Sequence, residues 1–261
     1  SQVRALGTNS VRALTTDQVV ALTTDQVTGL NTRTVQALST EAITALTTGQ
    51  IEVINTAGLA ALTTSQVKAL STDAVIALST YQVANLTTGT MAALSTAQVA
   101  AIETTDIQAL STRQLATIAT GTVSALTTDQ VVALTTYQIG NLSTTTLKAL
   151  SSDQIAAIET TDIQALTTGQ LAGLVSSTVS ALTTDQVIAL TTYQVSNLST
   201  ATLKALSSDQ LVAIETTDIQ ALKTSQLATL ATSTVAALST DQIQALLTSQ
   251  LGALSTSGVR A

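Results

Sequence analysis

The sequence predicts an all-α repeat solenoid of very short helices, with one helix for every eight residues and about three to four helices per superhelical turn. The prediction rests on three positions of an eight-residue unit, and each recurs at every eighth residue without interruption along the 261 residues. Leu or Ile fills every eighth position over Leu6–Leu254, and Val, Ile, Leu or Met does so over Val3–Val259. Thr or Ser fills every eighth position over Thr8–Thr256. Repetition this regular predicts stacked units that share one continuous core.

The octad ALTTDQVV, residues 13–20, shows why each unit is a helix followed by a turn. Its strong apolar positions lie three residues apart, as in Val19 and Leu22, which is helical spacing rather than the alternation of a strand. One continuous helix is excluded, because eight residues at about 100° each overshoot two turns by roughly 80° and the apolar stripe would spiral around the rod. Each octad therefore predicts one short helix and one tight turn.

Threonines predict the start of each helix. A hydroxyl before the first turn accepts a backbone N–H bond as an N-cap, and Thr15 with Gln18 also fits a capping box. Of the two candidates we expect the near-invariant Thr16 to be the cap, with the helix running over residues 17–22. Asp17 then suits the positive end of the helix.

The apolar pattern also predicts which side chains are buried. We expect the Val and Leu positions to point inward, the Ala before Leu to allow close packing, and the residue between Val and Ala to face water. A six-residue helix has no independent stability in water, so stacking must supply it.

A second period of 56 residues, seven octads, lies over the first. Residues 125–180 and 181–236 are identical at 44 of 56 positions. Tandem duplication explains this without any geometric cause. Alternatively, seven octads complete two superhelical turns of about 3.5 helices each.

Composition bounds the class of protein. The chain carries 16 acidic and 9 basic residues, for a net charge of −7, and this argues against binding a nucleic-acid backbone. No apolar run approaches the roughly 18–20 residues of a membrane-spanning helix, so we expect no membrane insertion. We expect a single solenoid over residues 1–261 of about 32 repeats. Because both ends fall inside the octad pattern, we also expect it to be a segment of a longer array.

Three pairs of carboxylates form the first candidate site. The members of each pair lie three residues apart at an expected helix start: Glu103 with Asp106, Glu159 with Asp162, and Glu215 with Asp218. Oxygen ligands suit Ca²⁺, but two carboxylates fall short of the six to eight ligands that this ion takes. Capping and charge at the helix N-terminus explain the pairs equally simply, and we favour that interpretation.

A tyrosine series forms the second candidate site. Each tyrosine is followed four residues later by an asparagine, and the three pairs share the 56-residue spacing: Tyr81 with Asn85, Tyr137 with Asn141, and Tyr193 with Asn197. Spaced aromatic rings on one face would form a surface for a glycan, a peptide or a partner protein. Alternatively, Tyr covers a seam between helices and Asn bonds a turn carbonyl, which is the interpretation we favour.

No group of residues predicts catalysis. General acid–base chemistry needs a cleft and perturbed environments, whereas every carboxylate here fits the repeat on an expected surface. We therefore expect no enzyme activity and no cofactor.

The octad ALTTDQVV and its variants, ALSTDQIQ at residues 237–244 and ALTTGQIE at residues 45–52, resemble the ALTTxQ-type repeats of very large bacterial surface or secreted proteins. Such proteins are often labelled adhesin-like or haem-utilisation proteins. The resemblance covers essentially the whole chain and implies a solenoid of short helices in an extracellular or cell-surface array. The chain has no His or Cys and its only Met is Met91, so the ordinary axial ligands of haem are nearly absent.

Three functions fit these observations. The first is a structural spacer or stalk that holds other domains away from the cell, with flanking repeats and domains of the parent protein as its partners. The second is a binding module that uses its repeated surface for a glycan, a peptide or a partner protein. The third is end-to-end self-association through open ends.

Overall fold

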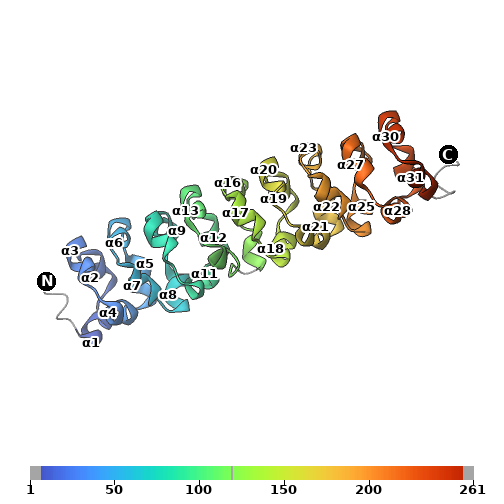
Figure 1. Cartoon of the computed structure of the whole chain (residues 1–261). Helices are drawn as coiled ribbons and strands as arrows, with labels where there is room; N and C mark the ends of the chain where they lie inside the picture. Colours follow the sequence, from blue (N-terminus) through green and yellow to red (C-terminus); the bar gives the residue numbers. More distant parts are fainter. Residues whose placement is uncertain (1–6, 119, 255–261) are drawn as a thin grey trace. The chain divides into compact units, whose positions relative to one another are not determined.

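The structure is a computed structural model that describes residues 7–118 and 120–254, and every regular element in that part of the chain is a short α-helix (Figure 1). The chain forms two compact units, Ser1–Ala133 and Leu134–Ala261, each of which we describe by itself. The predicted all-α repeat of one helix per octad is confirmed. The continuity of a single solenoid over residues 1–261 stays an expectation.

The helices of unit 1 are four to six residues long: α1 (Thr8–Arg12), α2 (Thr16–Val20), α3 (Thr24–Thr28), α4 (Thr32–Ala37), α5 (Thr40–Ala45), α6 (Thr48–Glu52), α7 (Thr56–Ala60), α8 (Thr64–Ala69), α9 (Thr72–Ile76), α10 (Thr80–Ala84), α11 (Thr88–Ala93), α12 (Thr96–Ala100), α13 (Thr104–Ala109), α14 (Thr112–Leu115), α15 (Thr120–Val123) and α16 (Thr128–Val132).

The helices of unit 2 have the same lengths: α17 (Thr136–Gly140), α18 (Thr144–Ala149), α19 (Ser152–Ala156), α20 (Thr160–Ile163), α21 (Thr168–Gly173), α22 (Ser176–Ser180), α23 (Thr184–Ile188), α24 (Thr192–Ser196), α25 (Thr200–Ala205), α26 (Ser208–Val212), α27 (Thr216–Ala221), α28 (Thr224–Leu227), α29 (Thr232–Ala236), α30 (Thr240–Ala245) and α31 (Thr248–Ala253).

The helix start lies one residue earlier than predicted. In α2 the N-cap is Thr15, whose backbone is extended and whose hydroxyl accepts the backbone N–H of Gln18. Thr16, which we expected to be the cap, is the first helical residue instead. The reason is the capping box: the side chain of Gln18 also accepts the backbone N–H of Thr15, so this pair satisfies two N–H groups at once.

The predicted inward positions form the core. Over Val11–Leu227 the Val-type side chains are essentially inaccessible, and most of the Leu-type side chains one turn later are buried as well. The position between Val and Ala faces water, as predicted, and even its apolar members are exposed, among them Val20 and Ile76. The Ala before Leu is half-buried in most octads.

The turns between helices need no glycine. Nearly all described helices end with a bond in which the N–H of the Leu-type residue donates to the carbonyl of the Val-type residue three positions earlier, as from Ile102 to Val99 at 3.2 Å. Among the described residues no backbone has a positive φ. The rarity of Gly in the sequence follows, because no turn uses the left-handed conformation that favours it.

Within each unit, helices pack on helices three positions along the chain. Helix α3 contacts α6 and α6 contacts α9, and Figure 1 shows these three following one another along one edge of unit 1. In unit 2 the same interval joins α24 to α27 and α27 to α30. Helix α21 also contacts α25, four positions on.

A buried glutamine links helices four positions apart. In α12 the Gln98 amide nitrogen donates to the carbonyls of Val67 and Leu70, at the end of α8, at 2.7 and 2.8 Å. Its amide oxygen accepts the backbone N–H of Ser95 at 2.8 Å, which caps its own helix. We call this arrangement the glutamine bridge; within the units it is made by Gln50, Gln66, Gln82, Gln98, Gln114, Gln130, Gln170, Gln186, Gln194, Gln210, Gln226, Gln242 and Gln250.

The first two glutamines show that the bridge, not the cap, causes the burial. Gln18 and Gln26 make the same capping box, yet Gln18 is exposed and Gln26 is only half-buried. No helix lies four positions before α2 or α3 in the described chain, so these amides have no carbonyls to bond. Helices pack on helices three positions along the chain and are bridged by glutamines to helices four positions along. Each superhelical turn within a unit therefore contains between three and four helices, as predicted.

Gln98→Ala tests the bridge. The change leaves the Ser95 N–H and the Leu70 carbonyl without this partner and removes one of the two bonds to the Val67 carbonyl, so we expect the free energy of unfolding to fall by about 1–3 kcal/mol. Urea unfolding followed by circular dichroism measures it. Gln36→Ala is the matched control, because Gln36 is exposed on a helix of the same unit. Equal losses for the two variants would contradict the role of the bridge.

Candidate functional site

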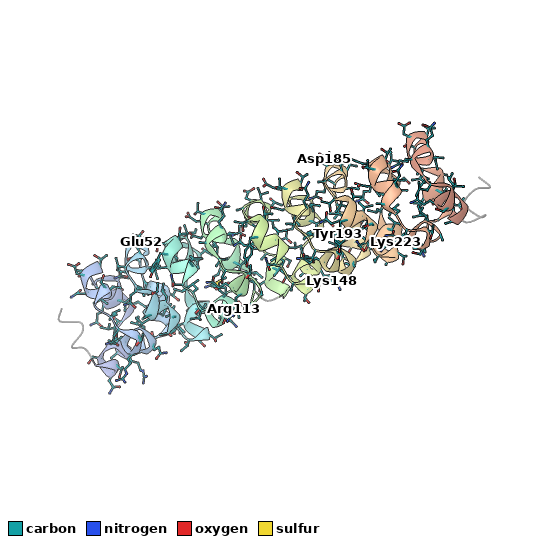
Figure 2. All side chains as sticks on the ribbon, viewed as in Figure 1. Glu52, Arg113, Lys148, Asp185, Tyr193 and Lys223 are labelled. Carbon is teal, nitrogen blue, oxygen red and sulfur yellow. The ribbon has the colours of Figure 1, made fainter. Side chains whose placement is uncertain are left out.

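The tyrosines lie on the surface, at the second position of their helices. Tyr81, Tyr137 and Tyr193 are 71, 72 and 71 % exposed, in α10, α17 and α24. Figure 2 labels Tyr193 among the side chains of unit 2. Such exposure is unusual for an aromatic side chain, which normally buries most of its ring. The rings therefore do not cover a seam between helices, which was the interpretation we favoured from the sequence.

The asparagines cap the ends of the tyrosine helices. The Asn85 amide donates to the carbonyl of Tyr81 at 2.8 Å, and Asn141 and Asn197 make the same bond at the same distance. The side chain of the C-cap residue thus bonds back to the carbonyl of the second residue of its own helix. The sequence interpretation placed the asparagine bond on a turn carbonyl, whereas its acceptor is the carbonyl of the tyrosine inside the helix.

The two carboxylates of each pair have different surroundings. Glu103, Glu159 and Glu215 are exposed N-cap residues whose side chains make no capping bond. Asp106, Asp162 and Asp218 are only 2, 2 and 4 % exposed. Among the described residues, Oδ2 of Asp106 is the one buried side-chain oxygen or nitrogen with no hydrogen-bond partner. No group of three or more His, Cys, Asp or Glu that could hold a metal occurs in that part of the chain.

The helices that carry the tyrosines contact the helices that carry the carboxylate pairs. The tyrosine helix α10 contacts the carboxylate helix α13 in unit 1, and α24 contacts α27 in unit 2. In unit 2 a side chain adds to this contact, since the Lys223 ammonium donates to Oδ1 of Asn197 at 3.2 Å. In the sequence each tyrosine lies 22 residues before the glutamate of a carboxylate pair, and packing between helices three positions apart joins the two motifs.

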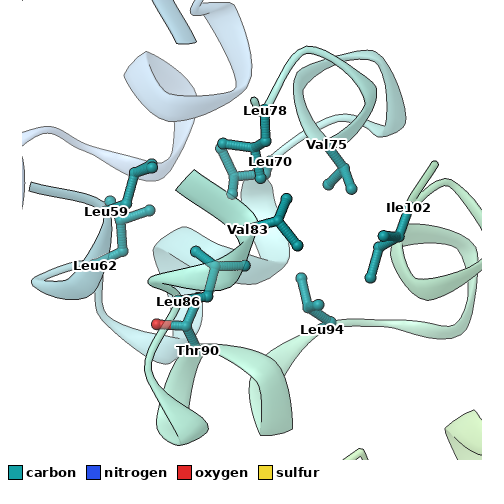
Figure 3. A pocket seen from close by; sticks show the side chains of 10 residues that line it. All are labelled: Leu59, Leu62, Leu70, Val75, Leu78, Val83, Leu86, Thr90, Leu94 and Ile102. Atoms are coloured by element: carbon teal, nitrogen blue, oxygen red, sulfur yellow. The ribbon is translucent and has the colours of Figure 1, made fainter. Parts of the chain in front are cut away.

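One enclosed space in the interior of unit 1 has a free volume of about 10 Å³, at the lower limit for a single water molecule. Figure 3 shows its lining, in which Val83, Leu94 and Ile102 point toward one another and the Thr90 hydroxyl is the only polar group drawn. This space is too small to hold a ligand.

Charged side chains are dispersed over the surface. Figure 2 labels Glu52 and Arg113 of unit 1 and Lys148 of unit 2, all of which are exposed. At the start of α5, hydrogen bonds from its own backbone N–H and from the hydroxyls of Ser39 and Thr40 hold the pKa of the exposed Glu41 carboxyl below its usual value. This is the behaviour of a carboxylate at a helix N-terminus and marks no site.

The sequence singled out residues at the third helical position, but it did not predict that the glutamines there bond to another helix. Gln18 was recognised as half of a capping box, and Asp106 as part of a carboxylate pair. The structure shows that both residue types occupy one buried position, where Gln bridges to a preceding helix. One feature of the sequence could have indicated the bridge: a polar residue, most often Gln, recurs directly before the buried Val-type residue.

The geometry defines a class: a repeat protein of short, capped helices that stack at intervals of three and four. The family model described as the ALTTAQ repeat matches the chain at residues 1–32, 51–88, 99–136, 155–192, 193–224, 211–248 and 219–256. These matches cover well over half of the sequence, so the chain belongs to the ALTTAQ repeat family. A search of curated proteins found no match.

No helix in the described ranges has the length and apolar character needed to cross a membrane, since the longest has six residues.

Tyr81→Ala separates a surface role from a packing role. Because the ring is exposed, we expect the free energy of unfolding to change by less than about 0.5 kcal/mol. Val83→Ala, two residues away and buried, should cost about 1–3 kcal/mol. Urea unfolding of both variants makes the comparison. A loss at Tyr81 as large as that at Val83 would assign the ring to packing.

Proposed function

We propose that the chain is a non-catalytic structural spacer whose length is set by the number of octads. The observation that carries this proposal is the glutamine bridge, which recurs at the same interval in both units, for example from Gln98 to Leu70 and from Gln210 to Leu182. The bridge joins octads four positions apart, and helix packing joins octads three positions apart. Stability is then a sum of repeated local terms, and octads can be added without a new core.

The proposed mechanism is additive stacking. Packed helices lie about 8–10 Å apart, so each superhelical turn adds about that length. Seven octads make about two turns, and the 56-residue period would add about 16–20 Å. Duplication of this period would then lengthen the spacer in steps.

The proposed setting is a large extracellular or cell-surface protein of bacteria, of the adhesin-like kind. The support is the resemblance of the octads to the repeats of such proteins. The partners would be the flanking repeats and domains. Exposed charge of both signs with a net value of −7 gives no basic surface for nucleic acid.

Deletion of residues 125–180 tests the spacer. The deletion joins Ser124 to Ala181 and keeps the octad phase, because Ala125 and Ala181 occupy equivalent positions. We expect the helical content per residue to stay constant and the maximum dimension in solution scattering to fall by about 16–20 Å.

A deletion of 52 residues, 125–176, is the matched control, because it breaks the octad phase at nearly the same length. It should lower the helical content per residue. An unchanged maximum dimension for the 56-residue deletion, or equal behaviour of the two, would contradict additive stacking. Growth of the scattering mass with concentration would instead support end-to-end self-association.

A second candidate function is binding through the tyrosine surface, and the exposure of the three rings favours it. In unit 2 an exposed Ile188 precedes Tyr193 by five residues, and Ile76 stands in the same relation to Tyr81 in unit 1. Each of these segments thus exposes an aliphatic side chain, two residues with hydroxyls and a flat ring within six residues of sequence. This mixture suits a sugar ring, which presents both apolar faces and hydroxyl groups.

A glycan array tests this candidate with the intact chain. Binding should be lost when Tyr81, Tyr137 and Tyr193 are all changed to Ala, and should be kept when all three are changed to Phe, because the flat ring remains. The Ala variant is expected to fold, since the rings are exposed. No bound glycan, or equal binding by the Ala variant, would remove the second candidate.

A further inference from the structure

Three helices carry an aspartate at the third position, where many of the others carry the bridging glutamine. Asp106 lies in α13, between Gln98 of α12 and Gln114 of α14, and all three side chains are buried. Asp218 lies in α27, between Gln210 of α26 and Gln226 of α28. Asp162 holds the same position in α20. Burial of a carboxylate at a position that elsewhere holds a neutral amide needs a physical cause.

The register of the bridges shows what these aspartates face. Gln98 and Gln114 donate to carbonyls 31 and 28 residues earlier, namely Val67 with Leu70 and Val83 with Leu86. The helix between them, α13, follows the same repeat. Asp106 is therefore placed opposite the carbonyls of Val75 and Leu78 at the end of α9.

Asp218 stands in the same relation to an earlier helix of unit 2. Its neighbours Gln210 and Gln226 bond Leu182 and Leu198, again 28 residues earlier. By the same register Asp218 is placed opposite Val187 and Leu190. The repeat register thus places a buried carboxylate opposite a helix C-terminus in each unit, and the unpartnered oxygen is found at Asp106.

An aspartate cannot replace the bonds that glutamine makes. A carboxylate only accepts hydrogen bonds, whereas the glutamine amide nitrogen donates to the carbonyls. Oxygen atoms then face oxygen atoms in a buried place, at the negative end of a short helix. The unpartnered Oδ2 of Asp106 is the direct sign of this conflict. The aspartate side chain is also shorter by one methylene, roughly 1.5 Å, which leaves space where the amide nitrogen would lie.

We propose that Asp106 and Asp218 each bind a monovalent metal cation, Na⁺ or K⁺, in the place of the glutamine amide nitrogen. The ligands are the carboxylate and the carbonyl oxygens of Val75 and Leu78 for Asp106, and of Val187 and Leu190 for Asp218. One positive charge neutralises the single buried carboxylate. Ca²⁺ is less suited, because its second positive charge would stay uncompensated beside a single buried carboxylate, and the neighbouring Glu103 is exposed. The cation thereby restores the link between helices four positions apart, and the site does not depend on the proposed function.

Thermal unfolding of the full chain tests the site. Melts followed by circular dichroism are compared in NaCl, KCl and choline chloride at equal ionic strength. We expect NaCl or KCl to raise the midpoint by a few degrees over choline chloride, because a ligand that binds only the folded state stabilises it. CaCl₂ at the same ionic strength should add nothing further.

Two variants make the test specific. In the triple variant Asp106→Gln, Asp162→Gln and Asp218→Gln, the amide donors return, and the difference between the metal and choline salts should disappear. Gln98→Asp should enlarge the difference, because it creates one more site in unit 1. Gln98→Asp also keeps the test available if the triple variant fails to fold.

Three outcomes would overturn the proposal. Equal midpoints of the unaltered chain in all three salts would mean that no cation, and at most a water molecule, lies beside Asp106. A salt difference that persists in the triple variant would be a general salt effect. A response to CaCl₂ alone would exclude the monovalent ion.

Discussion

The buried amide of the glutamine bridge is the interaction on which the rest of the structure depends. Its oxygen accepts a backbone N–H at the start of its own helix, and its nitrogen donates to carbonyls at the end of a helix four positions earlier, as Gln98 does with Ser95, Val67 and Leu70. A helix of five residues leaves most of its backbone groups without internal partners. One side chain thus satisfies groups at the ends of two helices, and burial of the Val and Leu positions then stabilises the stack.

The third helical position is also where the repeat tolerates exceptions, and these residues differ in the hydrogen bonds that their side chains make. Thr202 shares a hydrogen bond between its hydroxyl and that of Ser199, and its hydroxyl lies 3.4 Å from the carbonyl of Leu171. Ala74 has no polar atom in its side chain and is simply buried. Asp106 alone among these brings a charge and no donor. Variation at this single position therefore changes the chemistry of the interior while the octad keeps its shape.

Much of the fold could be predicted because the octad is a local code. The three-residue spacing of Val19 and Leu22 required a helix, and the hydroxyls required a cap near Thr15 or Thr16. The choice between the two hydroxyls failed because frequency in the sequence was taken as the measure of capping, whereas Thr16 is already helical. The bridge could not be predicted, since its bonds join residues 28 to 31 positions apart and depend on the number of helices per turn. For the same reason Tyr81 was assigned to a seam that its exposure excludes.

The direction of the bridge gives the stack a polarity. The later helix always supplies the glutamine donor and the earlier helix always supplies the carbonyl acceptors, as Gln50 and Gln82 do toward Leu22 and Ile54. A ribosome delivers the chain in that same order. Each octad that emerges finds its acceptors already assembled a turn behind it, so the stack can extend as it is synthesised without waiting for residues still to come. An array with any number of octads then folds by adding one octad at a time to the turn before it, and the rate of each addition does not depend on the length of the array.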